Sequence, residues 1–244
     1  MRYLVLSDIH ANLAAFTAVL DDTPSFDRIW CIGDVIGYGP DPNECIALLR
    51  QHDHACVAGN HDWATLGHLD TDDFNPDARR ALDWTRANLE EAGRSYLEQL
   101  PTSVILDDFM LVHGSPRQPI WEYILYAGIA ASNFEHLTTP YCFVGHTHAP
   151  VMFQETSRDG TQAVDTFLPA YNEPLELPLG RLILNPGSVG QPRDSDPRSC
   201  YVILDTDAHT VLYRRVEYPI EKTQQRMYQL GLPMRLAARL SNGW

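Results

Sequence analysis

The chain begins with an alternation of short apolar runs and amphipathic segments. Residues 3–6, 29–32 and 55–58 are apolar runs of strand length, and residues 12–22 and 43–52 carry apolar side chains at helical spacing. A strand–helix–strand order of this kind needs crossover connections, which join parallel strands. The first quarter of the chain therefore predicts a βαβαβ unit.

The pattern changes after about residue 100. Residues 76–100 still have helical spacing, and the tail over residues 220–240 is helical again, with a break at 231–233. Between them, strand-like runs cover residues 104–106, 109–112, 142–144, 151–153, 181–184, 201–204 and 211–216. Residues 205–209 are expected to form a hairpin turn. With no repeat or linker in sight, we expect residues 1–244 to form one α/β domain with two packed sheets and flanking helices.

Charge and composition exclude several classes of protein. The formal net charge is −14, which argues against bulk binding of nucleic acid. No run approaches the roughly 18 apolar residues of a membrane span, and the N-terminal segment does not resemble an export signal. The five cysteines are an odd number without a CxxC pair and lie mostly in apolar runs. We therefore expect a cytoplasmic protein with reduced, buried thiols and no membrane partner.

Side chains that can bind metal ions gather where predicted strands end. Because ligand sites of α/β sheets form at the carboxyl ends of strands, these side chains are candidates for one site. They are Asp8 and His10, Asp34, Asn60 and His61, His113, and His146 and His148. The other histidines, His52, His54, His68, His136 and His209, are expected to be structural or exposed.

The mixture of imidazole, carboxylate and carboxamide indicates a particular chemistry. These groups suit Mn, Fe, Zn or Co, and the lack of thiolates argues against a structural zinc site. Two ions about 3.5–4 Å apart can hold a phosphoryl group between them and need a shared carboxylate. A single histidine after a strand is more often an ordinary hydrogen-bonded residue, so the hypothesis depends on the whole ordered series.

That series reads Asp-x-His, Gly-Asp, Gly-Asn-His-Asp, His-Gly and Gly-His-Thr-His, and it resembles the calcineurin-like metallophosphoesterase superfamily over residues 8–188. The chain is most similar to the small bacterial and archaeal branch, with its phosphodiesterases and diadenosine-polyphosphate hydrolase-like proteins. The resemblance implies a four-layer α/β/β/α sandwich of two mixed sheets. It also implies two divalent metal ions, with the native pair open among Mn, Fe, Zn, Co and Ni.

The resemblance also assigns roles to residues. It implies Asp8, His10 and His148 as ligands of one ion, Asn60, His113 and His146 as ligands of the other, Asp34 as the bridging carboxylate, and His61 as the general acid. The implied nucleophile is a hydroxide that bridges the two metals and attacks phosphorus in line.

Some positions depart from the family's patterns. The branch often has glycine after Asp-x-His, whereas this chain has Ala11, followed by Asn12. Asn12 either contacts phosphate or caps the following helix. Residues 33–39 lack the second aspartate and the arginine that protein Ser/Thr phosphatases carry there. Arg193 is the candidate replacement as a phosphate clamp, with a surface ion pair to Asp194 or Asp196 as the alternative.

Two segments could shape the substrate pocket. Residues 63–75 follow the Gly-Asn-His-Asp motif and contain His68 and several acids. Residues 115–126 follow His113 and contain Arg117, Trp121, Tyr123 and Tyr126, and these aromatic side chains either stack on a nucleobase or pack onto the core or a subunit interface. Tyr38 poses the same alternatives.

The leading hypothesis is a phosphodiesterase or nucleotide pyrophosphohydrolase that acts on a small phosphorylated substrate, with a nucleotide as one candidate. The alternatives are a phosphomonoesterase, including a protein Ser/Thr phosphatase, and a non-catalytic binding protein on the same fold. The last ranks lowest because every expected ligand is present. The oligomeric state stays open, and a homo-oligomer is among the options.

Overall fold

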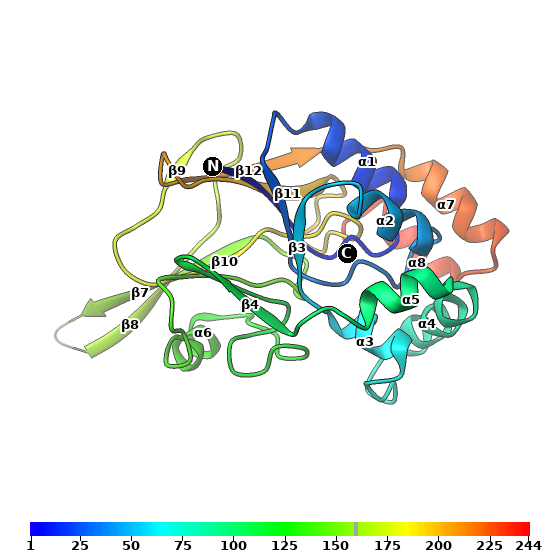
Figure 1. Ribbon diagram of the computed structural model, residues 1–244, viewed down its shortest axis with the longest axis horizontal. Coiled ribbons are helices and arrows are strands. Elements are labelled where there is room, and N and C mark those ends of the chain that lie inside the picture. The colour runs from blue at the N-terminus through cyan, green and yellow to red at the C-terminus, as the bar shows by residue number, and fades with distance from the viewer. Residues whose placement is uncertain (159–160) are drawn as a thin grey trace.

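Two six-stranded sheets form the framework of the protein in the computed structural model, which describes residues 1–158 and 161–244 (Figure 1). The first sheet has the order β3-β2-β1-β11-β12-β9. Its strands are β1 (Arg2–Leu6), β2 (Arg28–Cys31), β3 (His54–Cys56), β9 (Leu175–Glu176), β11 (Ser199–Asp205) and β12 (Thr210–Val216). The β1–β2 and β2–β3 pairs are parallel, as the βαβαβ pattern predicts, and the other pairs are antiparallel.

The second sheet has the order β4-β5-β6-β10-β7-β8. Its strands are β4 (Ser103–Leu106), β5 (Phe109–Val112), β6 (Tyr141–Phe143), β7 (Val151–Arg158), β8 (Thr161–Phe167) and β10 (Leu182–Asn185). The central pairs β5–β6 and β6–β10 are parallel, and the outer pairs are antiparallel. Both sheets are therefore mixed.

Alternation along the strands creates the layers. In β1, Tyr3 and Val5 pack between the sheets with Trp30 and Phe143, whereas Leu4 belongs to the cluster on the opposite face. That opposite face is covered by α1 (Leu13–Asp22), α2 (Pro42–Leu49) and α5 (Glu91–Leu97). The far face of the second sheet is covered by α6 (Ala127–Phe134). The result is the expected α/β/β/α sandwich.

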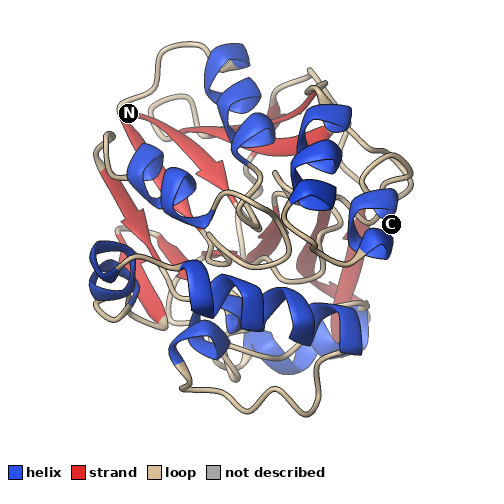
Figure 2. Cartoon of the chain, turned by 90° about the vertical axis from the view of Figure 1, so that its right-hand side faces the viewer, coloured by secondary structure: helices blue, strands red, loops and turns tan. Residues whose placement is uncertain are grey.

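A further group of helices gathers at one end of the molecule, in front of the strands in Figure 2. These helices are α3 (Asn60–Leu66), α4 (Pro76–Asn88), α7 (Ile220–Gln229) and α8 (Met234–Arg239). They share an apolar cluster that includes Tyr38, Phe74 and Leu236. In the described part of the chain, no helix combines the length and apolar character of a membrane span.

Local signals explain several boundaries. The side chain of Asn12 caps α1 by accepting the Ala15 N–H (3.2 Å), and Asn75 caps α4 in the same way. The helical pattern over residues 76–100 is two helices, because the backbone is extended at Leu89 and Glu90. The tail is broken at residues 231–233 as expected, and the strand pattern missed β8 and β9.

Candidate metal centre

The predicted site residues lie together at one edge of the sandwich, where strands of both sheets end. Asp8 follows β1, Asp34 follows β2, His113 follows β5 and His146 follows β6. Asn60 and the other predicted ligands join them from neighbouring loops and from the start of α3. Every one of these side chains is buried, with at most 3% of its surface exposed. So many buried polar side chains in one place need hydrogen-bond partners or bound ions.

One group of candidate ligands consists of Asp8, His10 and His148. The Nε2 atoms of the two histidines are 3.0 Å apart, and Asp8 Oδ1 is 3.2 Å from His148 Nε2 and 3.7 Å from His10 Nε2. Two loops far apart in sequence, one after β1 and one after β6, thus bring three ligand atoms to one point. This arrangement could hold a metal ion.

A second group consists of Asn60, His113 and His146. The Nε2 atom of His113 is 3.0 Å from Asn60 Oδ1 and 3.2 Å from His146 Nδ1. With Asp34, the two histidines form another cluster that could hold a metal ion.

Asp34 lies between the two groups. Its Oδ2 atom is 3.6 Å from His10 Nε2 and 3.4 Å from His113 Nε2. Its Oδ1 atom accepts the backbone N–H of His61 (2.8 Å), whereas Oδ2 has no hydrogen-bond partner among the described residues. Asp8 Oδ1 is unpartnered in the same sense. Two buried carboxylate oxygens therefore face imidazole nitrogens without a donor.

Backbone carbonyls fix the histidine tautomers. His10 Nδ1 donates to Ile36 O (3.2 Å), His113 Nδ1 to Ile32 O (2.8 Å) and His148 Nδ1 to Gln191 O (2.6 Å), because a carbonyl can only accept. A neutral imidazole then presents a bare Nε2.

Bare nitrogens at 3.0 Å, such as those of His10 and His148, repel each other unless a cation lies between them. The donor set and its outer hydrogen bonds therefore fit divalent ions.

The pKa values favour the deprotonated forms that metal ligands need. Burial would raise the pKa of Asp8, but His148 and other neighbours hold it below its usual range. In the same way, His113 and other histidines hold the pKa of Asp34 below its usual range despite burial. Burial lowers the pKa of His10 and of His146. His113 is different: burial lowers its pKa, but Asp34 outweighs this effect and raises it to about 9. A raised pKa means that His113 holds a proton, whose positive charge lies next to Asp34. A metal cation near Asp34 would supply that positive charge in its place.

Comparison with known proteins identifies the family. A model described as the calcineurin-like phosphoesterase superfamily domain matches residues 1–209. The chain belongs to this superfamily. It is therefore a hydrolase that acts on phosphoric esters, in a family that generally binds two divalent metal ions.

Similar proteins agree with this assignment. The crystal structure of a metallophosphoesterase from Sphaerobacter thermophilus is 48% identical, covers 100% of this chain and 99% of that chain, and superposes with a TM-score of 0.89. An uncharacterized protein of Methanocaldococcus jannaschii is 34% identical over 98% of this chain and 97% of its own length. The symmetrical bis(5'-nucleosyl)-tetraphosphatase of Pseudomonas putida is 30% identical over 103 residues, or 35% of this chain and 36% of that enzyme.

The phosphoesterase site depends on strained loops. Asp8, His10, Asp34 and His148 all have left-handed backbone, with φ between 49° and 60°. Ala11 shares this conformation at φ 50°, where the family pattern often has a glycine. Such conformations persist at functional sites when surrounding bonds hold them in place.

Asp62 supplies some of those bonds, although the sequence pattern assigned it no role. Its carboxylate accepts the N–H groups of Asp34 (2.9 Å), Gly59 (3.0 Å) and Ile36 (3.2 Å). Asp62 thus ties the loop that carries Asp34 to the start of α3. Its position in the Gly-Asn-His-Asp motif was the available signal.

The two predicted substrate contacts have different surroundings. Asn12 caps α1, donates to Gly190 O (2.9 Å) and accepts from Thr223 (2.9 Å), so the capping alternative is observed. Arg193 instead donates to the Tyr38 hydroxyl (3.2 Å) and to Gln191 Oε1 (2.9 Å). The ion-pair alternative is not observed, because Asp194 pairs with Arg215, and Asp196 pairs with Arg198 and Arg215.

Aromatic rings surround His61 and His146. The Tyr38 and His61 ring centroids are 4.2 Å apart, and Phe74 meets His61 edge-on at 5.2 Å. Tyr123 stacks on His146 at 3.7 Å, with 37% of its own surface exposed. These rings close the sides of the site.

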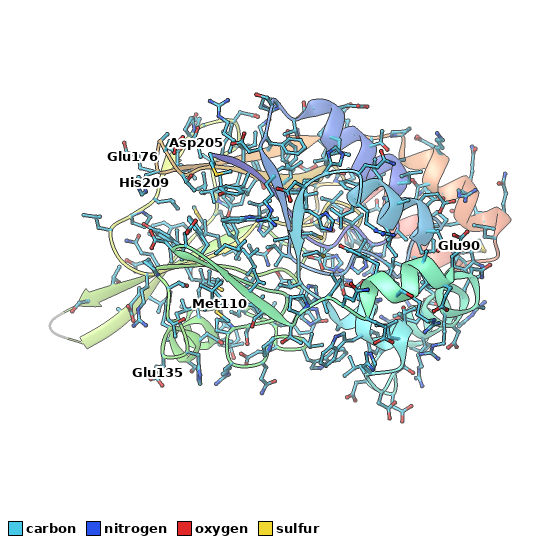
Figure 3. All side chains as sticks on the ribbon, viewed as in Figure 1. Glu90, Met110, Glu135, Glu176, Asp205 and His209 are labelled. Atoms are coloured by element: carbon cyan, nitrogen blue, oxygen red, sulfur yellow. The ribbon has the colours of Figure 1, made fainter. Side chains whose placement is uncertain are left out.

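The remaining histidines lie elsewhere. His209 is on the β11–β12 turn, beside Glu176 and Asp205 at one end of the molecule (Figure 3). The β1–β11 register pairs Asp205 with Arg2, at the opposite end of β1 from Asp8. His54 bonds to Tyr96 (2.9 Å) and His68 to Glu98 (2.8 Å).

Proposed function

We propose that this phosphoesterase is a dinuclear-metal-dependent phosphodiesterase or nucleotide pyrophosphohydrolase. One ion would be held by Asp8, His10 and His148, the other by Asn60, His113 and His146, and both by Asp34. The unpartnered oxygens of Asp8 and Asp34, which face bare imidazole nitrogens, are the observation that carries this proposal. When bound, the two ions would supply Lewis acidity toward the phosphoryl group and the attacking water.

His61 is assigned the transfer of a proton to the leaving-group oxygen. Its Nδ1 atom is buried against Gly37, where a Cβ added to the glycine would lie only 2.5 Å away, and it has no hydrogen-bond partner among the described residues. Nε2 is therefore the atom that would carry the transferred proton. Burial lowers the pKa of His61 to about 4, so the negative charge of a bound phosphate ester is needed to keep the ring protonated.

Arg193 and Tyr38 are assigned to the phosphate. The guanidinium group lies 5.7 Å from the centre of the Tyr38 ring, and that ring packs on His61 and His10. A guanidinium group can bind two phosphate oxygens at once, which would orient the ester toward His61.

The preference for diesters or pyrophosphates is supported by two observations. Residues 33–39 lack the arginine and the second aspartate of protein Ser/Thr phosphatases, and a stretch of 103 residues is similar to a symmetrical bis(5'-nucleosyl)-tetraphosphatase.

The test compares turnover of bis-p-nitrophenyl phosphate and p-nitrophenyl phosphate with added Mn. The wild type is expected to favour the diester, and Asp34→Ala is expected to lose at least ~100-fold of kcat. Asp73→Ala removes an exposed carboxylate and serves as the control, with unchanged turnover. Equal activity of Asp34→Ala and Asp73→Ala would refute the proposal, and a preference for the monoester would favour a phosphomonoesterase.

A further inference from the structure

A hollow of about 500 Å³ lies between the start of α4 and the C-terminal segment. Its volume is in the range of small-molecule sites. Residues that line it include Asn75, Asp77, Arg235, Arg239 and Trp244. In Figure 2 the C-terminal end lies on the helical face that includes this segment.

Two arginines and Asp77 are the charged side chains that line this hollow, and Arg239 Nε donates to the main-chain oxygen of Trp244. Arg235 and Arg239 are four residues apart on α8, so their side chains share one side of the helix. Burial, and then the positive charges of Arg193 and Arg235, lower the pKa of Arg239. Arg235 and Arg239 thus place two positive charges along this hollow in a chain whose net charge is −14. A cationic group of this kind suits a polyanion.

The hollow adjoins the catalytic residues. Leu236 of α8 lines it and also lines a small cavity with His10 and Tyr38 on the other side. Arg193 bonds to Tyr38 (3.2 Å), and Tyr38 belongs to the same apolar cluster as Leu236. A substrate whose scissile phosphate lies at Arg193 can therefore extend toward Arg239 and Arg235.

Other groups in the hollow suit a nucleoside. The Trp244 side chain lines it and is 64% exposed, so an indole face can stack on a base. Asp77 offers a carboxylate that can accept from a sugar hydroxyl or a base amino group. The residues of α8 and the C-terminal segment that line the hollow lie beyond residues 1–209, which the family model matches, whereas Asn75, Pro76 and Asp77 lie within them. None of these lining residues is a predicted metal ligand.

We propose that this hollow is a subsite for a second phosphate and its nucleoside, which makes nucleoside polyphosphates the substrate class. The inference rests on the proposed function, because it assumes that the scissile phosphate binds between Arg193 and the metal centre. Arg235 is assigned to the second phosphate and Trp244 to the base.

The test is the binding of ADP and of inorganic phosphate, measured by calorimetry on the full chain with Mn. Arg235→Gln is expected to weaken ADP by at least about tenfold, as loss of a charge-assisted hydrogen bond should, and to change phosphate affinity less than about twofold. Trp244→Ala is expected to weaken ADP but not phosphate. Lys222→Gln removes one positive charge from the exposed part of α7 and is the matched control. Arg235 is exposed, so its substitution should leave the fold intact.

Several outcomes would overturn the subsite: no ADP binding by the wild type, equal ADP binding by wild type and Arg235→Gln, or an equal loss of ADP and phosphate affinity. Turnover of bis-p-nitrophenyl phosphate is measured on the same samples. Turnover with ADP binding that does not depend on Arg235 would refute the subsite alone. Binding that depends on Arg235, without turnover of any phosphate ester, would retain the subsite and refute the proposed function.

Discussion

Left-handed backbone occurs in two different settings in this protein. In the loops of the metal centre, Asp8, Asp34 and His148 adopt it while fully buried. In the turn between β11 and β12, His209 adopts it while exposed to solvent. The conformation costs roughly 1–2 kcal/mol per residue in either place. What differs is the surrounding structure. Hydrogen bonds from other segments fix the buried loops, whereas the turn at His209 is surrounded by solvent.

The buried loops are held by bonds between segments. Asp62 accepts three backbone N–H groups from residues 34, 36 and 59, so one side chain ties two loops together. Asp205 accepts the backbone N–H groups of Asp207 and Ala208 within its own turn, and it also accepts from the exposed side chain of Arg2 on β1 (3.0 Å). Strain at the metal centre therefore aims ligands, whereas strain in the turn only reverses the chain.

The largest expected effect is on stability. Asp62→Ala leaves three buried N–H groups without acceptors and should lower the free energy of unfolding by ~3 kcal/mol or more. Asp205→Ala, in the exposed turn, should cost less than about 1 kcal/mol. Urea unfolding of both variants measures the difference, and similar losses would contradict the contrast between the two settings.

Gly37→Ala should have the next largest effect. Gly37 has φ +90°, and an added Cβ would lie 2.5 Å from His61 Nδ1. We expect a loss of ~2 kcal/mol in stability from left-handed strain and the clash, together with a reduced kcat because His61 moves. Thermal unfolding and diester turnover are the measurements.

Gly67→Ala is the matched control for this substitution. Gly67 has a similar φ of +87°, but nothing lies within 4 Å of the added Cβ. It should cost only ~1 kcal/mol and leave turnover unchanged. An equal loss of activity in both variants would show that the His61 contact is irrelevant.

Metal addition should sharpen the contrast without any mutation. Ions between His10, His148 and the two carboxylates would remove repulsion, so the site loops should open less often. Hydrogen exchange at the amides of Asp34 and His146 should slow at least ~10-fold with Mn, which corresponds to ~1.4 kcal/mol. The amides of Asp207 and Ala208 serve as the internal reference and should not change. Uniform slowing across the chain would argue against a local site.

The smallest effect is expected at the exposed turn. His209→Gly relieves left-handed strain but adds chain entropy to the unfolded state, so stability should change by less than ~1 kcal/mol. Turnover should stay at the wild-type level, since the turn is at the opposite end of β1 from Asp8. A loss of turnover measured in the same diester assay would place His209 in the function after all.

Much of the fold could be predicted because burial leaves a periodic pattern. The runs at residues 3–6, 29–32 and 109–112 became β1, β2 and β5, since core strands are apolar along their whole length. The helix α3 was missed because it begins inside a polar motif, with Asn60 and His61 buried for a chemical reason. The strand β7 continues past Phe153 as far as Arg158 because it pairs with β8, and no apolar pattern marks that extension.

The candidate site could be predicted as a set of residues but not as a network. Strand ends marked Asp8, Asp34 and His113, because strand ends converge at a sheet edge. The contact of Arg193 with Tyr38 joins positions 155 residues apart, and no local pattern encodes such a contact. The part played by Asp62 was hidden for the same reason, since its three donors come from two separate loops.

Metal stoichiometry measures whether Asp34 is shared by two ions. Wild type and Asp34→Asn, stripped with chelator and then reloaded with Mn, are analysed by elemental mass spectrometry after removal of free metal. We expect two ions per chain in the wild type and one or none in Asp34→Asn, because one carboxylate is shared between the two ligand groups. A wild type that saturates at one ion or fewer, or an Asp34→Asn variant that still holds two, would contradict this expectation.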